Sequence, residues 1–378
     1  MLILPLLALY IHIPWCVRKC PYCDFNSHEE KTIPEKTYVA QLLADLEKDL
    51  PFVQGRKLHS IFFGGGTPSL FSVKSIGDIL RGIKNRIDFE DDIEITLEAN
   101  PGTAEAEKFA GFHAVGINRL SIGVQSFLPK HLDKLGRIHD SAQAKNAVVF
   151  AQDAGFERIN IDLMHGLPDQ NCTEAMADLQ QAVSLGVTHI SWYQLTIEPN
   201  TVFYQQRPPL PAEDDLWEIQ QQGLAFLQEN GFVQYEVSAF AKGNQRGRHN
   251  LNYWQFGDYL GIGAGAHGKI TLPETQQIIR YSKTRLPRHY LERSDTFFAE
   301  KKCILNEALA SEFLMNALRL KEGVDARLFA ARTGFPVRSI DKQRQLLVQQ
   351  GLLINDAQRL ATTEHGFLFL NNVLAGFL

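Results

Sequence analysis

The sequence contains little cysteine and no excess of positive charge. Only 5 of its 378 residues are cysteine, which is too few for the disulfide framework of a small secreted protein. Its 38 Lys and Arg residues are outnumbered by 43 Asp and Glu residues, and no run of basic residues compensates locally. Proteins that bind nucleic acid carry a basic surface that neutralises phosphates. We therefore expect no nucleic-acid partner.

The sequence also contains no apolar run of the ~20 residues that a membrane-spanning helix requires. The segment 1–13 is apolar, but it lacks the basic start of a secretory signal and contains Pro5. We interpret this segment as a buried strand, and we expect a cytoplasmic protein without a transmembrane segment. Because a single core stops growing at about 250–300 residues, the chain length predicts two domains.

Six short runs rich in Ile, Val and Phe recur along the first two-thirds of the chain, with helical periodicity between them. The predicted strands are Leu7–Ile13, Ser60–Phe63, Ile93–Ala99, Arg119–Val124, Arg158–Met164 and His189–Leu195. The predicted helices are Tyr38–Leu50, Val73–Arg86, Ala104–Ala114, Ala142–Ala154 and Thr173–Leu185. This alternation predicts an α/β fold with a parallel sheet. We expect a partial (β/α)6 TIM-like barrel, with an open doubly wound sheet as the alternative.

Polar and glycine-rich segments follow the predicted strands directly. They are Cys16-x3-Cys20-x2-Cys23, Gly64–Pro68, Glu98–Pro101 and Gln125-Ser126, and Asp162 lies within the fifth strand. In parallel α/β folds, the loops at the carboxyl ends of the strands converge on one site. The sequence therefore predicts one site that collects all of these residues.

The last third of the chain has a different character. It predicts a helix over Asp214–Glu229, one strand over Phe232–Phe240, helices over Ala308–Leu320, Asp325–Arg332 and Val337–Gln350, a hairpin over Leu352–Thr362 and a last helix. This C-terminal pattern is typical of a winged-helix-like α+β domain. We divide the chain into a barrel over 1–240, a connecting region over 241–298 and the C-terminal domain over 299–378.

The cysteine triplet is the strongest chemical signal in the sequence. Three soft thiolates on one short loop favour an iron–sulfur cluster, zinc or copper(I). Structural zinc sites usually pair two C-x2-C clips, and the sequence contains no second clip. Three ligands would leave one iron of a [4Fe–4S] cluster open. We favour the cluster, with a zinc knuckle or three unrelated thiols as alternatives.

The residues around the triplet resemble those of a known family. The segments that carry the resemblance are Tyr10–Phe25, Gly64–Pro68, Glu98–Pro101, Gly123–Ser126, Leu135–Arg137, Asp162–Pro168 and His249–Trp254. They are similar to the HemW-type haem chaperones, a radical-SAM family related to oxygen-independent coproporphyrinogen III oxidase. The resemblance covers essentially the whole chain. It implies a [4Fe–4S] cluster, S-adenosylmethionine (SAM) and haem as the bound groups, and a radical-SAM barrel as the fold.

The resemblance also implies site residues. It places the cluster on Cys16, Cys20 and Cys23, haem on His249, and SAM on Tyr10, Tyr22, Gly65, Gly66, Thr67, Glu98, Gln125, Arg137 and Asp162. These residue types suit the task, because a carboxylate can pair with two ribose hydroxyls and an arginine with the SAM carboxylate. The resemblance assigns no catalytic residue.

Two departures separate the chain from the oxidases. Phe25 stands where the oxidases carry a fourth cysteine, and only nine residues precede Tyr10, where the oxidases carry an N-terminal extension. Both features favour a haem chaperone that delivers haem to acceptor proteins, among them membrane-associated respiratory proteins. A porphyrinogen decarboxylase and another radical-SAM enzyme, such as a methylase, are the alternatives, and the sequence leaves open whether the chain is an enzyme.

Overall fold

The computed structural model describes residues 1–102 and 107–377. Its centre is a 12-stranded sheet with the order β14-β13-β12-β11-β1-β4-β5-β6-β7-β8-β10-β9. Six of these strands are parallel neighbours: β1 (Leu7–Ile13), β4 (Leu58–Gly65), β5 (Phe89–Ala99), β6 (Arg119–Gln125), β7 (Ile159–His165) and β8 (His189–Gln194). They follow one another in chain order. The partial (β/α)6 barrel is therefore confirmed, and the doubly wound alternative, in which the order reverses, is wrong.

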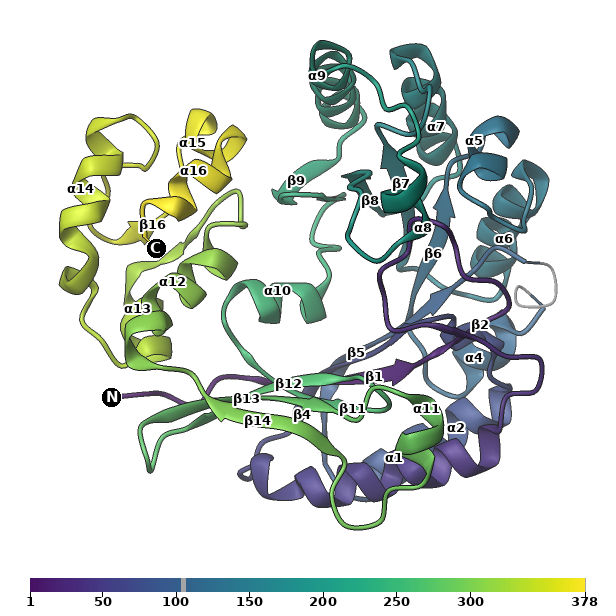
Figure 1. Ribbon diagram of the computed structural model, residues 1–378, viewed down its shortest axis with the longest axis horizontal. Helices are drawn as coiled ribbons and strands as arrows, with labels where there is room; N and C mark the ends of the chain where they lie inside the picture. The colour runs from purple at the N-terminus through teal and green to yellow at the C-terminus, as the bar shows by residue number, and fades with distance from the viewer. Residues whose placement is uncertain (103–106, 378) are drawn as a thin grey trace.

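Helices cover the outer side of the curved sheet (Figure 1). They are α1 (Glu35–Asp49), α2 (Val73–Lys84), α4 (Phe109–Ala114), α5 (Pro129–Lys134), α6 (Ser141–Asp153) and α7 (Cys172–Ser184). Capping boxes at Asp140 and Asn171 satisfy free backbone N–H groups at the starts of α6 and α7. The sequence predicts the barrel helices well, except that it misses α5. The predicted helix over 104–114 begins in residues 103–106, which lie outside the described part of the chain.

Both edges of the six-stranded parallel sheet continue as further, mostly antiparallel strands that the sequence analysis largely missed. Beyond β1 lie β11 (Asp258–Ile262), which is parallel to β1, and the antiparallel β12 (His267–Leu272), β13 (Gln277–Lys283) and β14 (Phe298–Cys303). Beyond β8, the single strand predicted over Phe232–Phe240 is wrong. The chain turns after Glu236 and forms two antiparallel strands, β9 (Val233–Glu236) and β10 (Ala239–Ala241).

Buried ion pairs attach strands β11 to β13 to the barrel. The Lys283 ammonium lies 2.5 Å from Asp45 and 2.9 Å from Asp49 of α1, and all three side chains are fully buried. The buried Asp258 of β11 pairs in the same way with Lys269 of β12 at 3.1 Å. Removing one partner of a buried pair leaves an uncompensated charge. These pairs therefore fix the added strands in register against the barrel.

The remaining chain forms short connecting elements and a separate C-terminal unit. The connecting elements are β2 (Trp15–Cys16), β3 (His28–Glu29), α8 (Val202–Gln206), α9 (Glu213–Glu229), α10 (Arg248–Trp254) and α11 (Pro287–Leu291). The C-terminal unit contains α12 (Asn306–Ala317), β15 (Val324–Asp325), α13 (Ala326–Thr333), α14 (Asp341–Gln349), β16 (Arg359–Leu360), α15 (Glu364–Leu368) and α16 (Leu370–Ala375).

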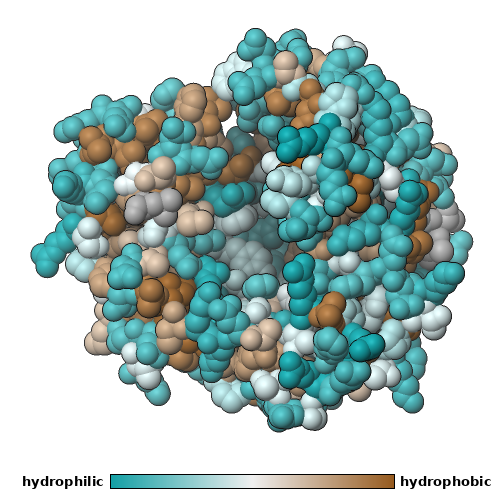
Figure 2. All heavy atoms as spheres, in the orientation of Figure 1, coloured by the Kyte–Doolittle hydropathy of each residue, from teal (hydrophilic) through white to brown (hydrophobic). Residues whose placement is uncertain are grey.

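The C-terminal unit packs around a second apolar core, centred on residues such as Phe313 and Phe329, to which Leu2, Phe256 and Ile278 also contribute. The hairpin predicted over Leu352–Thr362 is reduced to one bridge between Leu353 and Thr362, because β16 pairs with β15 instead. The predicted last helix is two short helices. The space-filling view shows the molecule hollowed near its centre, between this unit and the barrel (Figure 2). Within residues 1–102 and 107–377, no helix has the length and apolar character to cross a membrane.

Candidate functional site

A cavity of about 430 Å³ lies at the carboxyl ends of the parallel strands. Almost every residue that the sequence singles out lines it: Cys16, Cys20, Tyr22, Cys23, Gly65, Gly66, Thr67, Glu98, Gln125, Arg137 and Asp162. These residues come from β2 and the loop after it, from the ends of β4 to β7 and from the loop after α5. The expectation that one site collects them is therefore met in the described structure. We call this space the first cavity.

The three cysteines are free thiols, and each lies beside a polar side chain. The Thr67 hydroxyl donates to the Cys16 sulfur at 3.6 Å, and the Arg137 guanidinium donates to the Cys20 sulfur at 3.6 Å. The Cys23 sulfur lies 3.8 Å from the Ser27 hydroxyl. Burial raises the pKa of the Cys16 and Cys23 thiols. These thiols therefore lose their protons only when the binding of a metal stabilises the thiolates.

The arrangement of the cysteines fits a cluster better than a single ion. A zinc ion needs four ligands around one point, with Zn–S distances of about 2.3 Å. In the part of the chain that the structure describes, no three His, Cys, Asp or Glu side chains are placed to hold one metal ion. In a [4Fe–4S] cluster each cysteine binds a different iron, so the sulfurs lie farther apart. The donor set, three soft thiolates on one loop, therefore fits a cluster.

Two glycines at the end of β4 allow close approach of the backbone. A Cβ on Gly66 would lie 2.5 Å from the Trp15 carbonyl oxygen, and a Cβ on Gly65 would lie 2.6 Å from the His12 ring. Gly65 also has a φ of 117°, which other residues rarely adopt. The glycines bring the β4 loop against the start of the cysteine loop, and they leave the floor of the first cavity open.

Arg137 and Thr67 are held together by Asn100. The Asn100 amide donates to the Thr67 hydroxyl at 2.9 Å and accepts from the Arg137 guanidinium at 2.6 Å. Arg137 also donates to the Gly123 carbonyl at 2.6 Å. These contacts fix a guanidinium beside the cysteine loop, where it can face an anionic group such as a carboxylate.

Two buried carboxyl groups, Glu98 and Asp162, line the cavity and influence each other electrostatically. Burial and the neighbouring Asp162 raise the pKa of Glu98 to about 8, and burial raises the pKa of Asp162. Asp162 accepts from Ser121 at 2.9 Å and from Asn160 at 2.8 Å, and Glu98 accepts from the Gly65 amide at 3.2 Å. Acceptors fixed in this way suit a pair of hydroxyl groups on a ligand.

Gln125 and Tyr22 complete the wall of the cavity. Gln125 lies at a bulge between β6 and β7 and has a φ of 70°, a conformation that costs energy for a residue other than glycine. Its side chain accepts from the Tyr193 hydroxyl at 2.8 Å. Tyr22 packs near Phe203 and offers an aromatic face to the cavity. The strain at Gln125 is consistent with a functional position.

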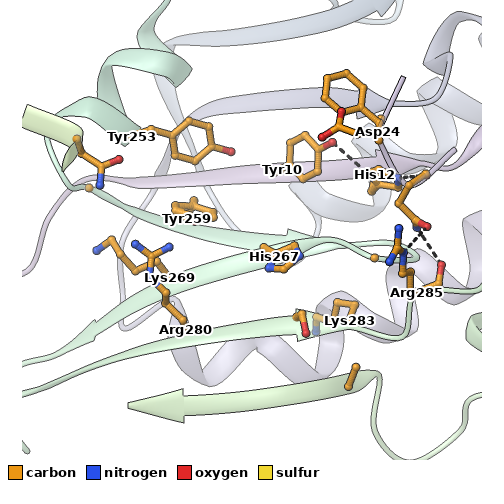
Figure 3. A pocket seen from close by; sticks show the side chains of 18 of the residues that line it. Tyr10, His12, Asp24, Tyr253, Tyr259, His267, Lys269, Arg280, Lys283 and Arg285 are labelled. Carbon is orange, nitrogen blue, oxygen red and sulfur yellow. Dashed lines mark hydrogen bonds between the residues drawn. The ribbon is translucent and has the colours of Figure 1, made fainter. Parts of the chain in front are cut away.

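Tyr10 lies outside the first cavity and lines a second one. This second cavity has a volume of about 810 Å³ and is bordered by β1, β11, β12 and β13 (Figure 3). Asp24, Phe25, Gly65 and Glu98 line both cavities, so the two adjoin. Tyr10 hydrogen-bonds through its hydroxyl with His12 at 3.0 Å. The sequence analysis did not foresee this second space.

His249 lies on α10, is only 1% exposed and lines a third, smaller cavity of about 240 Å³ together with Tyr10, Glu98 and Asp162. Its Nδ1 atom hydrogen-bonds with the Ser60 hydroxyl at 3.0 Å, and its Nε2 atom with the Tyr253 hydroxyl at 2.9 Å. Burial lowers the pKa of His249 to about 3, so the ring is neutral. Both nitrogens are therefore occupied within the protein.

Several residues that line the first cavity were not singled out from the sequence. They are Asn100, Ser121, Tyr193 and Ser27, and Asn160 lies directly behind them. Asn100 belongs to the Glu98–Pro101 segment, so its place after a strand was a usable signal. The others carry no motif, because their role is to hold a neighbouring side chain.

Comparisons with known proteins agree with this geometry. The Radical SAM superfamily model matches residues 10–180, and the HemN C-terminal domain model matches residues 304–369. Among solved structures, coproporphyrinogen III oxidase from Escherichia coli, described as a radical-SAM enzyme, aligns with a TM-score of 0.84. The alignment covers 99% of this chain and 90% of that one at 22% identity, so it supports the shared fold.

Relatives of known name span the whole chain. A protein of Haemophilus influenzae named "Heme chaperone HemW" is 53% identical, over 99% of this chain and 98% of its own length. The protein of the same name in Escherichia coli is 49% identical, over 99% of each chain. A mouse protein named "Radical S-adenosyl methionine domain-containing protein 1, mitochondrial" is 35% identical over 98% of this chain and 87% of its own. The chain belongs to the HemW family of the radical-SAM superfamily.

Proposed function

We propose that this protein is a haem chaperone that holds a [4Fe–4S] cluster with SAM in the first cavity and haem in the second. The observation that carries the proposal is the 53% identity to a named haem chaperone along the full length of both chains. The second cavity supports it, because its volume of about 810 Å³ falls within the range of small-molecule sites, about 300–1,000 Å³.

In this proposal Cys16, Cys20 and Cys23 would hold the cluster and would leave one iron free for SAM. This assignment is supported by the three free thiols, which line one cavity. Arg137 faces the SAM carboxylate, because it is fixed beside Cys20. When bound, the reduced cluster supplies an electron to SAM.

The other predicted SAM residues take roles that fit their surroundings. Glu98 and Asp162 accept hydrogen bonds from the ribose, and Tyr22 offers its ring to the adenine. Gly65, Gly66 and Thr67 admit the methionine end, and Gln125 lines the wall beside it. Tyr10 closes the boundary with the second cavity and contacts SAM only at that edge.

His249 contributes to haem binding by holding Tyr253, whose ring lines the second cavity. Direct ligation of iron by His249 would require its Nε2 atom to leave the Tyr253 hydroxyl. We further propose that the protein acts in the cytoplasm and that the haem acceptors include membrane-associated respiratory proteins, as the resemblance implies.

A transfer assay tests the proposal. Haem-loaded protein with a reconstituted cluster is mixed with an apo haem protein, and the absorption spectrum is followed with and without SAM and reductant. We expect the haem band of the donor to be replaced by that of the acceptor. Haem that stays with the donor under every condition would contradict the chaperone function.

The same preparation separates the enzyme alternatives. Incubated with coproporphyrinogen III, reductant and SAM, it should form no stoichiometric protoporphyrinogen. Formation of this product would show that the protein is an oxidase and would contradict the chaperone function. Transfer of a labelled methyl group from SAM to a product would indicate a methylase.

A further inference from the structure

The histidines around the two cavities differ in whether their ring nitrogens are already used. His249 is held on both nitrogens by Ser60 and Tyr253. His12 is held in the same way, by the Tyr10 hydroxyl at 3.0 Å and the Asn26 carbonyl at 2.9 Å. His267 makes no side-chain hydrogen bond with the described residues, and its side chain is exposed to the second cavity.

The register of the added strands explains why His267 points into this cavity. His267 pairs with Ser282, and Lys269 pairs with Arg280, so these four side chains share one face of strands β12 and β13. All four line the second cavity. The polar ends of the alternate residues Tyr281 and Lys283 contact Asp49 on the other face, although Lys283 also borders the cavity. Figure 3 shows His267 near the middle of the cavity, with Arg280 and Arg285 on opposite sides of it.

The cationic groups around the cavity also differ in whether they already have a partner within the protein. Lys269 is neutralised by Asp258, and Arg280 pairs with Glu312 at 2.5 Å. Arg285 makes no ion pair within the described residues. Its single side-chain hydrogen bond goes to the Asn26 amide oxygen at 3.2 Å. Arg285 is therefore a cation at the cavity that can accept a carboxylate partner from a ligand.

Aromatic rings complete a site suited to a flat macrocycle. Tyr253, Trp254 and Tyr259 line the second cavity on one side, and Phe25 lines the boundary with the first. Phe25 is 61% exposed, although it is a large apolar side chain. Flat apolar ligands with polar edges are recognised by such a combination of rings and a few charged groups.

We propose that haem binds in the second cavity with its iron on the His267 imidazole and a propionate on the Arg285 guanidinium. This inference rests on the proposed haem-chaperone function and assigns the haem ligand to a residue outside the His249 segment. Neutral imidazole is a common axial ligand of haem iron. Partial burial of the ring and the nearby Arg280 lower the pKa of His267, which favours the neutral form.

The test is a titration of ferric haem into the purified full chain, followed by absorption in the Soret region. We expect His267→Ala to weaken haem binding at least tenfold and to shift the Soret band, and added imidazole to restore the wild-type spectrum. His289→Ala is the matched control, since this exposed histidine lies outside the cavity on α11. SAM affinity of the cluster-loaded His267→Ala protein should equal wild type, which checks folding.

A His267→Ala protein with wild-type haem affinity and spectrum would overturn the assignment. If His249→Ala alone removed the Soret band and its SAM affinity stayed normal, the ligand would be His249. If the wild-type chain itself bound no haem, the proposed function would fail, and this outcome is distinct from a failure of the His267 variant.

The propionate contact has its own test. Haem dimethyl ester lacks the propionate charges, so wild-type protein should bind it several-fold more weakly than haem. The Arg285→Ala protein should bind haem and the ester alike, whereas the control Arg288→Ala, on the exposed side of α11, should keep the preference. A preference for haem that survives in Arg285→Ala would remove Arg285 from the site.

Discussion

The two adjoining cavities are built from different kinds of strand, and they differ in how far the sequence reveals them. The first cavity is lined by short loops at the ends of parallel strands, where several functional residues stand together in each segment. The second is lined by single residues spread along β11, β12 and β13, such as Tyr259, His267, Lys269, Arg280 and Ser282. A loop site can carry a motif, whereas a strand-face site spreads its residues at a period of two.

The two cavities also differ in how they are held. In the first cavity, hydrogen bonds orient the lining side chains. One such series of hydrogen bonds runs from Thr67 through Asn100 to Arg137. Buried ion pairs hold the strands beneath the second. A substitution should therefore affect one cavity and leave the other intact.

The largest effect is expected at the cysteine triplet. Cys16→Ser, Cys20→Ser or Cys23→Ser replaces a soft thiolate by a poor ligand for iron, so the absorbance of the reconstituted cluster should be lost. Haem binding by the same variants should be retained. Cys172→Ser and Cys303→Ser are the controls. Loss of the cluster in either control, or loss of haem binding in the triplet variants, would break the distinction between the cavities.

The next effect concerns the support of the second cavity. Lys283→Met leaves Asp45 and Asp49 buried without their cation, which should lower the free energy of unfolding by about 3–5 kcal/mol. Lys302→Met, at an exposed pair with Glu300, should change it by about 0–1 kcal/mol. Urea unfolding measures both. Equal effects would mean that the buried pairs do not hold β13.

A smaller effect is expected at Asp162. Asp162→Ala removes a carboxylate that Ser121 and Asn160 orient, so SAM affinity should fall about tenfold or more, or about 1.5–3 kcal/mol for hydrogen bonds to a charged group. Calorimetric titration of the cluster-loaded protein measures it. The exposed Asp153→Ala is the control. Unchanged SAM affinity in Asp162→Ala would exclude this residue from the SAM site.

The last effect is a pH dependence at Glu98. Its pKa is about 8 in the folded protein and 4.5 ordinarily, so between these values the folded state holds a proton that the unfolded chain has released. This contribution to stability is complete below the ordinary pKa and is lost as pH rises through about 8.

In the protein without cluster or SAM, Glu98→Gln should therefore become more stable relative to wild type as pH rises from 5 to about 8, by at most about 1.4 kcal/mol per pH unit. Thermal unfolding at several pH values measures the difference. The exposed Glu157→Gln should show no such trend. A constant difference between Glu98→Gln and wild type would show that Glu98 is not a buried acid.

The parts of the fold and of the site that could be predicted share one physical reason. Strands buried on both faces appear as continuous apolar runs, so Leu7–Ile13 could be identified at its observed bounds. The first cavity followed from the rule that such strand ends converge. Tyr10 is the one predicted SAM residue that the structure places on the other side of this boundary.

The missed strands have a different cause. Buried charges interrupt the apolar pattern of β12 and β13, because Lys269 and Lys283 are buried against acidic partners on other elements of the fold. No local sequence pattern identifies Asp45 as the partner of Lys283. The turn at Val237 and Ser238, which splits one predicted strand in two, is likewise set by contacts with other elements, such as that of the Val237 amide with the Arg319 carbonyl.

The central claim is that SAM and haem occupy two adjoining cavities at the same time. The direct measurement is a titration of ferric haem into cluster-loaded protein with and without saturating SAM, followed by calorimetry and absorption. We predict one haem per chain in both cases, with dissociation constants within tenfold of each other and with SAM retained. A haem dissociation constant that rises in proportion to SAM concentration would show competition for one site and would contradict the account.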